Sequence, residues 1–237
     1  MKKFIYILLA IILIFLFVNR VKVKDVYLEN AREELPIAVN IGDVNIQMID
    51  DIPLEYNLDV PFISQAPYAN WDLPYQEACE EAAIIMVHYY LENKEINIEL
   101  ADKEILDLVL WQENNLGDYK DTTVDETVNI VKDYWGYDFE VIPNPSVEVI
   151  KKYIANGHPV VAPFYGKVLS NPYYSGDGPL YHMMVIKGYT QDKFITNDPG
   201  TKRGEDYMYD YDILMSAMHD WNNGDVENGL PIAFIIK

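Results

Sequence analysis

The stretch YQEACEEAAIIMVHYY, residues 75–90, contains Cys79, the single cysteine of the 237-residue chain. Apolar residues recur three, four, seven, eight, eleven and twelve positions after Cys79. This spacing predicts a helix over 79–91 with one apolar stripe that begins at the cysteine. A cysteine in the first turn lies near unpaired backbone N–H groups and the positive end of the helix dipole, which stabilise a thiolate. Cys79 is therefore either a buried small hydrophobe or a nucleophile at the start of the helix.

A nucleophilic cysteine needs a basic partner here, because the two glutamates that follow it raise the pKa of the thiol. The chain has four histidines. His88, nine residues after Cys79, falls on the opposite side of the same predicted helix. We expect His158 to be a solvated loop histidine and His219 to lie near a helix end, where a cationic ring suits the dipole. His182 remains as the candidate base.

His182 opens the strand-like stretch HMMVIKGY, directly after the turn-rich loop 170–181. The next strand-like stretch, 193–200, returns after a short turn and brings Asn197 and Asp198 back beside the histidine. Either residue could orient the imidazole, and a register that sets Asp198 opposite His182 favours the aspartate. A thiolate, a histidine and a carboxylate form the nucleophile, base and orienter of covalent catalysis.

The order of predicted elements indicates an α+β domain. Helices are predicted over 79–91, 98–111, 123–134 and 146–155. Strands are predicted over 158–166, 181–190, 193–200 and 230–237, with a further helix at 210–219. Helices first and a mostly antiparallel sheet second are typical of this class.

The N-terminus predicts a membrane anchor. An uninterrupted apolar run over 4–18 is flanked by basic residues, and no small-residue cleavage pattern follows it. We therefore expect an uncleaved signal anchor over 1–24, a membrane-proximal stalk over 25–57 with a short strand at 44–48, and a domain over 58–237. This predicts a single-pass protein of the cell membrane with the domain outside the cytoplasm, or alternatively a secreted protein.

Composition limits the partners and cofactors. The formal net charge of −20 repels phosphate backbones, so nucleic acid is not expected as a partner. One cysteine excludes an intramolecular disulfide, and the scattered histidines give no zinc-site spacing. We therefore expect no metal and no cofactor.

Three motifs in sequence order carry a family resemblance: VPFISQAPYANW at 60–71, YQEACEEAAIIMVHYY at 75–90, and YHMMVIKGYTQDKFITNDPG at 181–200. Together they resemble the bacterial papain-like cysteine peptidases of the C-39-like family, relatives of the double-glycine leader peptidases that mature bacteriocins. The resemblance extends from about residue 58 to the C-terminus. It implies a papain-like fold, a stand-alone membrane-anchored form, and a peptide or protein substrate.

The resemblance also implies roles for individual residues. Cys79 would be the nucleophile, His182 the base and acid, and Asp198 the orienter of the histidine. Gln65 matches the glutamine that helps to bind the oxyanion, although it lies 14 residues before the nucleophile, farther than is usual. Gln76 is the alternative.

Two loops are expected to border the cleft and to bind substrate. One carries Trp71, and the other carries Tyr173, Tyr174 and Tyr181. The alternative for these tyrosines is a surface loop in which they simply pack.

Three other functions share this residue set. They are a peptidoglycan amidase or endopeptidase, an inactive peptide-binding relative, and a transglutaminase-like acyl transferase. Leader peptidases usually have Asp-Cys-Gly at the nucleophile, whereas this chain has Ala-Cys-Glu at 78–80. Cleavage after a double glycine is therefore not implied.

Overall fold

The computed structural model describes residues 34–44 and 52–237. The chain divides into two compact units, Met1–Leu35 and Pro36–Lys237, and the fold described below is that of the second unit. The predicted signal anchor over 1–24 lies outside the described residues, as does most of the strand predicted at 44–48. The domain boundaries proposed from the sequence stay predictions.

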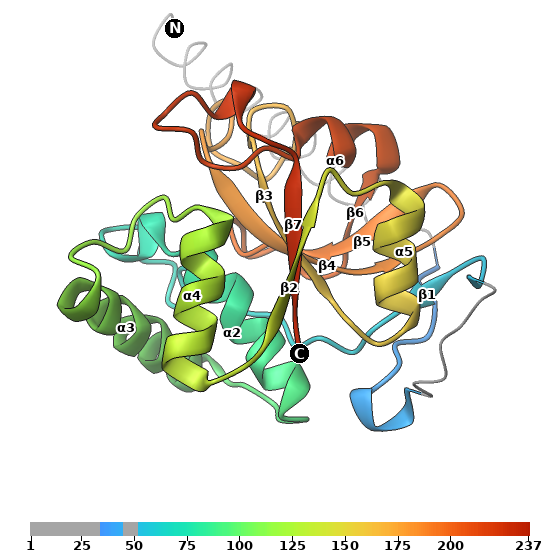
Figure 1. Ribbon diagram of the computed structural model, residues 1–237, viewed down its shortest axis with the longest axis horizontal. Coiled ribbons are helices and arrows are strands. Elements are labelled where there is room, and N and C mark those ends of the chain that lie inside the picture. The colour runs from blue at the N-terminus through green and yellow to red at the C-terminus, as the bar shows by residue number, and fades with distance from the viewer. Residues whose placement is uncertain (1–33, 45–51) are drawn as a thin grey trace, which may run out of the picture. The chain divides into compact units, whose positions relative to one another are not determined.

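An antiparallel sheet forms the centre of the second unit (Figure 1). In the described part of the chain its strand order is β2-β7-β3-β4-β5-β6, and β1 pairs with β4 beside this path. The strands are β1 Tyr56–Asn57, β2 Phe139–Pro143, β3 Val160–Phe164, β4 His182–Tyr189, β5 Lys193–Asn197, β6 Tyr207–Asp210 and β7 Ile232–Ile236. Every side chain of β4 is buried, so this strand is the middle of the core.

Helices cover the sheet (Figure 1). They are α2 Cys79–Leu91, α3 Ile98–Asn115, α4 Val124–Trp135, α5 Val147–Ala155 and α6 Tyr211–Ala217, with short 3-10 turns η1 Ile41–Asp43, η2 Tyr75–Glu77 and η3 Val226–Asn228. Figure 1 shows α2, α3 and α4 grouped together and α5 apart from them. Of this group, α2 packs on β4 and α3, and α4 packs on β7.

Side-chain caps fix where these helices begin. Asn97 and Ser146 each accept a hydrogen bond from a backbone N–H in the first turn of α3 and α5. Thr123 and Glu126 form a reciprocal capping box at the start of α4, and Gly136 ends that helix in the left-handed conformation. These local signals explain why the boundaries of the predicted helices lie close to the observed ones.

Helix α2 departs from the single stripe that the sequence predicts. Nearly all of its residues are buried, including Glu80 and Glu81, because the helix is enclosed between the sheet and α3. An all-round apolar helix is typical of a core position. The start of α2 is therefore held rigidly, with Cys79 at its first residue.

The prediction of an α+β domain with a mostly antiparallel sheet is confirmed. Strands β2 and β6 were not predicted. Both are short and largely half-buried, so neither has a strong alternating pattern. They form the two ends of the strand order given above, and β6 brings a tyrosine to the site described below.

The predicted membrane location needs correction. Within 34–44 and 52–237, no helix has the length and apolar character needed to cross a bilayer. The prediction of a single-pass membrane protein depended on residues 1–24, which the structure does not describe. A membrane anchor is therefore not supported.

Replacing Thr123 by Ala removes one half of the capping box of α4. We expect the free energy of unfolding to fall by about 1 kcal/mol, measured by urea denaturation. Ser216→Ala serves as the control, because Ser216 is an exposed helix residue that caps nothing, and its effect should stay within about 0.5 kcal/mol. Equal effects of the two substitutions would contradict the assigned cap.

Candidate active site

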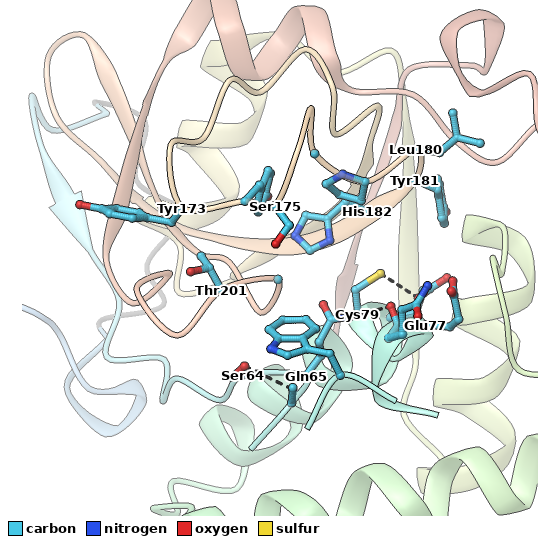
Figure 2. A pocket seen from close by; sticks show the side chains of 18 of the residues that line it. Ser64, Gln65, Glu77, Cys79, Tyr173, Ser175, Leu180, Tyr181, His182 and Thr201 are labelled. Carbon is cyan, nitrogen blue, oxygen red and sulfur yellow. Dashed lines mark hydrogen bonds between the residues drawn. The ribbon is translucent and has the colours of Figure 1, made fainter. Parts of the chain in front are cut away.

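A cleft of about 710 Å³ opens between the start of α2 and the start of β4 (Figure 2). Its lining includes eight of the side chains predicted from the sequence: Gln65, Trp71, Gln76, Cys79, Tyr173, Tyr174, Tyr181 and His182. Asp198 is fully buried behind the histidine, to which it is hydrogen-bonded. The structure thus brings together residues that lie far apart in the sequence.

Cys79 lies at the first residue of α2 and is 6% exposed. Figure 2 shows its sulfur and the His182 ring on facing sides of the cleft. The thiol donates a hydrogen bond to Glu80 Oε2, with 3.0 Å between sulfur and oxygen. The backbone N–H of Cys79 has no carbonyl within the helix to bond, because it belongs to the first turn. It is thus positioned to bind an anion beside the sulfur.

The surroundings of Cys79 oppose the formation of a thiolate. Burial raises the pKa of the thiol well above its usual range, and the charge of Glu80 and its hydrogen bond raise it further. A hydrogen bond from the backbone of Met183 acts in the opposite direction. In the resting site the sulfur therefore holds its proton, and a base must remove it.

The two glutamates that follow the cysteine, Glu80 and Glu81, are both buried, which the sequence analysis did not predict. Glu80 Oε1 accepts from the backbone N–H of Thr122 at 3.0 Å, so both of its oxygens are engaged. Glu81 accepts from the side-chain amide of Gln112, and its Oε2 has no hydrogen-bond partner in the described chain. Burial raises the pKa of Glu81 to about 7. The sequence feature that could have predicted their burial is their position within an otherwise apolar helix.

His182 and Asp198 form a buried pair. His182 Nε2 lies 2.7 Å from Asp198 Oδ1, and the two residues are 2% and 0% exposed. Because Nε2 is bonded to the carboxylate, Nδ1 is the ring nitrogen left for Cys79. This is the geometry that a base and its orienter require.

The register of β4 and β5, which the sequence does not fix, differs from the one that would set Asp198 opposite His182. The observed pairs, Val185 with Asn197 and Ile186 with Thr196, place position 200 rather than Asp198 in line with His182. Asp198 therefore does not lie directly opposite His182 in the ladder. The contact forms because β5 ends at Asn197, after which the chain turns and the aspartate side chain reaches the ring.

Asn197 does not share this position. Its side-chain amide donates to the carbonyls of Val60 and Pro61, at 3.0 and 3.3 Å. Its Oδ1 accepts from the backbone N–H of Asp206. The amide therefore ties the sheet to the segment before α2 and makes no contact with the imidazole.

Further donors surround Asp198. Its Oδ1 accepts from the N–H of Gly200 at 3.0 Å, and its Oδ2 accepts from Asn171, Tyr174 and Tyr209. Burial acts to raise the pKa of Asp198, but the charge of His182 and these donors outweigh it and hold the pKa below its usual value. Asn171 and Tyr209 carried no signal in the sequence.

Gln65 lies in the cleft, 4% exposed. Its Nε2 donates to the carbonyls of Tyr75 and Gln76, at 2.9 and 3.0 Å. Its Oε1 is buried and has no hydrogen-bond partner among the residues of known placement. Gln76 itself is exposed. Gln65 is far from Cys79 in sequence because residues 66–74 form a loop between them. The chain returns to the site through η2, whose first carbonyl accepts a hydrogen bond from the Gln65 amide.

The aromatic residues of the two loops differ in exposure. Trp71 is 43% exposed, and Tyr173 is half-buried with the guanidinium of Arg203 4.9 Å from its ring centre. Tyr181 is buried, and its hydroxyl donates to the carbonyl of Thr122 at 2.8 Å. Trp71 and Tyr173 are thus the more open to a ligand.

The other histidines lie outside the cleft. His88 stacks on Trp135, with 4.6 Å between ring centres, and its Nδ1 lies 3.0 Å from Tyr137 Oη. His158 is half-buried rather than fully solvated, and His219 is bonded to backbone carbonyls. Within the described ranges, no three metal-ligating side chains are grouped closely enough to hold an ion.

A cysteine at the start of a core helix, facing a strand histidine that is bonded to a carboxylate, is the arrangement of papain-like cysteine peptidases. The model of the family described as Peptidase_C39 like family matches residues 57–225. The chain belongs to this family of cysteine peptidases, as the sequence motifs predicted.

Two solved structures are similar to the chain. One, from Bacillus anthracis and described as a C39-like peptidase, is 16% identical with a TM-score of 0.49, over 76% of this chain and 95% of that one. The other, xylellain, a cysteine protease from Xylella fastidiosa, is 12% identical with a TM-score of 0.43, over 86% of this chain and 94% of that one. No curated protein matches the chain.

Burial raises the pKa of Glu80 well above its usual range, and Glu80→Gln removes this ionisable carboxyl group and its bond to the sulfur. Because Glu80 raises the pKa of Cys79, we expect the midpoint of the alkylation rate against pH to move to lower pH, measured with iodoacetamide. Glu81→Gln is the matched control, since Glu81 acts less strongly on the sulfur, and its shift should be smaller. A midpoint that stays or rises in Glu80→Gln would contradict this role.

Glu81 makes stability depend on pH. Its pKa of about 7 exceeds the ordinary 4.5, so between these values the folded state binds more protons than the unfolded state. The free energy of unfolding should therefore fall as pH rises through this window, and Glu81→Gln should reduce the fall. Denaturant unfolding at several pH values measures how the free energy of unfolding depends on pH. Glu113→Gln, at an exposed position of α3, should keep the wild-type slope; a wild-type slope in Glu81→Gln would contradict the assignment.

Proposed function

We propose that the protein hydrolyses peptide bonds, with Cys79 as nucleophile, His182 as base and acid, and Asp198 as the residue that orients the histidine. The observation that carries this proposal is the buried bond from His182 Nε2 to Asp198 Oδ1, at 2.7 Å, opposite the sulfur. This bond leaves the second ring nitrogen for the thiol. Membership of a cysteine-peptidase family supports the same reaction.

The reaction proceeds in two acyl-transfer steps. His182 takes the proton of the Cys79 thiol, and the sulfur attacks the carbonyl carbon of the substrate. The imidazolium then gives its proton to the leaving nitrogen, and the C–N bond breaks to leave a thioester. Water attacks the thioester with His182 as base, the C–S bond breaks, and the acid and the thiol are released.

The activation of Cys79 depends on where its proton goes. Burial and Glu80 raise the pKa of the thiol, so the site does not favour an isolated thiolate. Transfer to His182 creates an imidazolium, which the charge of Asp198 stabilises. The thiolate therefore forms as one half of an ion pair with His182.

The oxyanion needs two donors. We propose the backbone N–H of Cys79 as the first, because it is unbonded within the helix and adjoins the sulfur. Gln65 is the second, and it is preferred to the exposed Gln76 because it is buried beside the start of α2. Nε2 of Gln65 already donates to two carbonyls, so it reaches the oxyanion by giving up one of these bonds.

The substrate is a peptide or protein segment lying in the cleft. Trp71 and Tyr173 are proposed to contact it, because both line the cleft and are partly exposed. Tyr181 supports the wall through its bond to the Thr122 carbonyl. The roles of Trp71, Tyr173 and Tyr181 remain proposals, and no preference for a double glycine is assigned.

Labelling with an electrophilic thiol probe near pH 7 tests the proposal. Wild type should label at Cys79, and His182→Ala should label at least about a hundred times more slowly, because its base is lost. His88 lies on the same helix as Cys79 but stacks on Trp135 outside the cleft. His88→Gln should therefore label at the wild-type rate. Equal rates for wild type and His182→Ala, or no labelling of either, would refute an activated cysteine.

Product analysis distinguishes the remaining functions. Mass spectrometry of a peptide library incubated with the labelling-competent protein should find new carboxyl termini. Products joined to an added amine would assign acyl transfer instead, and cleavage restricted to peptidoglycan fragments would assign the amidase function. Labelling without any product would indicate an inactive peptide-binding relative.

A further inference from the structure

Asp198 Oδ2 accepts three hydrogen bonds that the proposed reaction does not use. The donors are Tyr174 Oη at 2.6 Å, Tyr209 Oη at 2.8 Å and Asn171 Nδ2 at 3.1 Å. They come from strand β6 and from the loop that borders the cleft. Together with the two bonds to Oδ1, these donors satisfy the buried carboxylate.

Tyr174 differs from the other two donors because it also contacts the histidine. Its ring lies 5.6 Å from the His182 ring at an interplanar angle of 80°, an edge-to-face contact. The side chain lines the cleft and is half-buried, while its hydroxyl reaches inward to the fully buried Asp198. Tyr174 therefore lies against both members of the His182–Asp198 pair.

We infer that Tyr174 is a positioning residue, which fixes the Asp198 carboxylate through its hydroxyl and limits the rotation of the His182 ring through its edge. This inference rests on the proposed function of the site. It replaces a substrate-binding role for the Tyr174 hydroxyl, because that group is already bonded to Asp198.

The donors fill the acceptor positions of the carboxylate. Oδ1 accepts from His182 and from the N–H of Gly200, and Oδ2 accepts from Tyr174, Tyr209 and Asn171. A carboxylate offers about four lone-pair positions, so the group cannot rotate without losing bonds. Oδ1 is thereby held toward the imidazole.

The same donors set how strongly Asp198 stabilises the imidazolium. Each donor withdraws charge from the carboxylate, so fewer donors leave a more basic group and a His182 ring that holds its proton more tightly. Asp198 and Tyr174 contact the His182 ring, Cys79 faces it across the cleft, and Glu80 is bonded to the sulfur. The other titratable residues that line the cleft are Glu77, Asp121, Tyr173, Tyr181 and Lys202. Removing one hydroxyl therefore acts on one identifiable pair.

Tyr174→Phe isolates the hydroxyl, because phenylalanine keeps the ring edge on His182. Tyr209→Phe removes the same kind of donor from β6, away from the loop. Tyr153→Phe is the matched control, since Tyr153 lies on α5 outside the cleft lining and donates its hydroxyl to another carboxylate, that of Glu140. All three variants are compared as the full chain.

The NMR signals of the His182 ring are assigned by comparison with His182→Ala. Their titration with pH reports directly on the His182–Asp198 pair. We expect the midpoint of this titration to move to higher pH in Tyr174→Phe and in Tyr209→Phe, and to stay at the wild-type pH in Tyr153→Phe. A merely structural role would lower the folded fraction without moving this titration. An unchanged titration in Tyr174→Phe overturns the inference.

Turnover of a cleaved peptide provides the second readout. For Tyr174→Phe we expect kcat to fall about tenfold with KM unchanged. We also expect the alkaline limb of the pH profile of kcat to move to higher pH. A raised KM with unchanged kcat assigns Tyr174 to substrate binding and overturns the inference. Failure of wild type to label or to turn over removes the proposed function, whereas the NMR titration still decides the hydrogen-bond network.

Discussion

The buried hydrogen bond between His182 and Asp198 is the constraint around which the site is organised. A carboxylate with no exposed surface carries a large desolvation penalty unless every lone pair is bonded. Five donors converge on it, from β4, β6, the loop at 170–181 and the turn after β5. The need to satisfy one charge therefore accounts for the course of several separate segments.

On the other side of the cleft, a fully enclosed α2 has a different consequence. Because the helix lies between the sheet and α3, the residues that follow Cys79 are buried even where they are acidic. Glu80 joins the sulfur to the loop before α4 through the N–H of Thr122. The enclosure that holds the nucleophile rigid also makes its deprotonation harder, so the cysteine depends on the histidine.

Sequence reasoning reached the helix at 79–91 and the class of the fold, because spacing and capping are local signals. The role of Gln65 came from the resemblance to a known family. Sequence reasoning failed where distant segments decide the geometry. The shift in pairing between Ile186 and Gly188 sets the register at His182, and no local pattern encodes it. Tyr209 reaches Asp198 through a strand too short to predict, and the partners of Gln65 follow from the path of a long loop.

Two of the donors to Asp198, Asn171 and Tyr174, belong to the loop that borders the cleft. The conformation of this loop and the charge state of the histidine are therefore coupled equilibria. Thermodynamic linkage makes such coupling reciprocal. A peptide bound against this loop would therefore alter the proton affinity of His182, and protonation of His182 would alter the affinity for that peptide by the same factor.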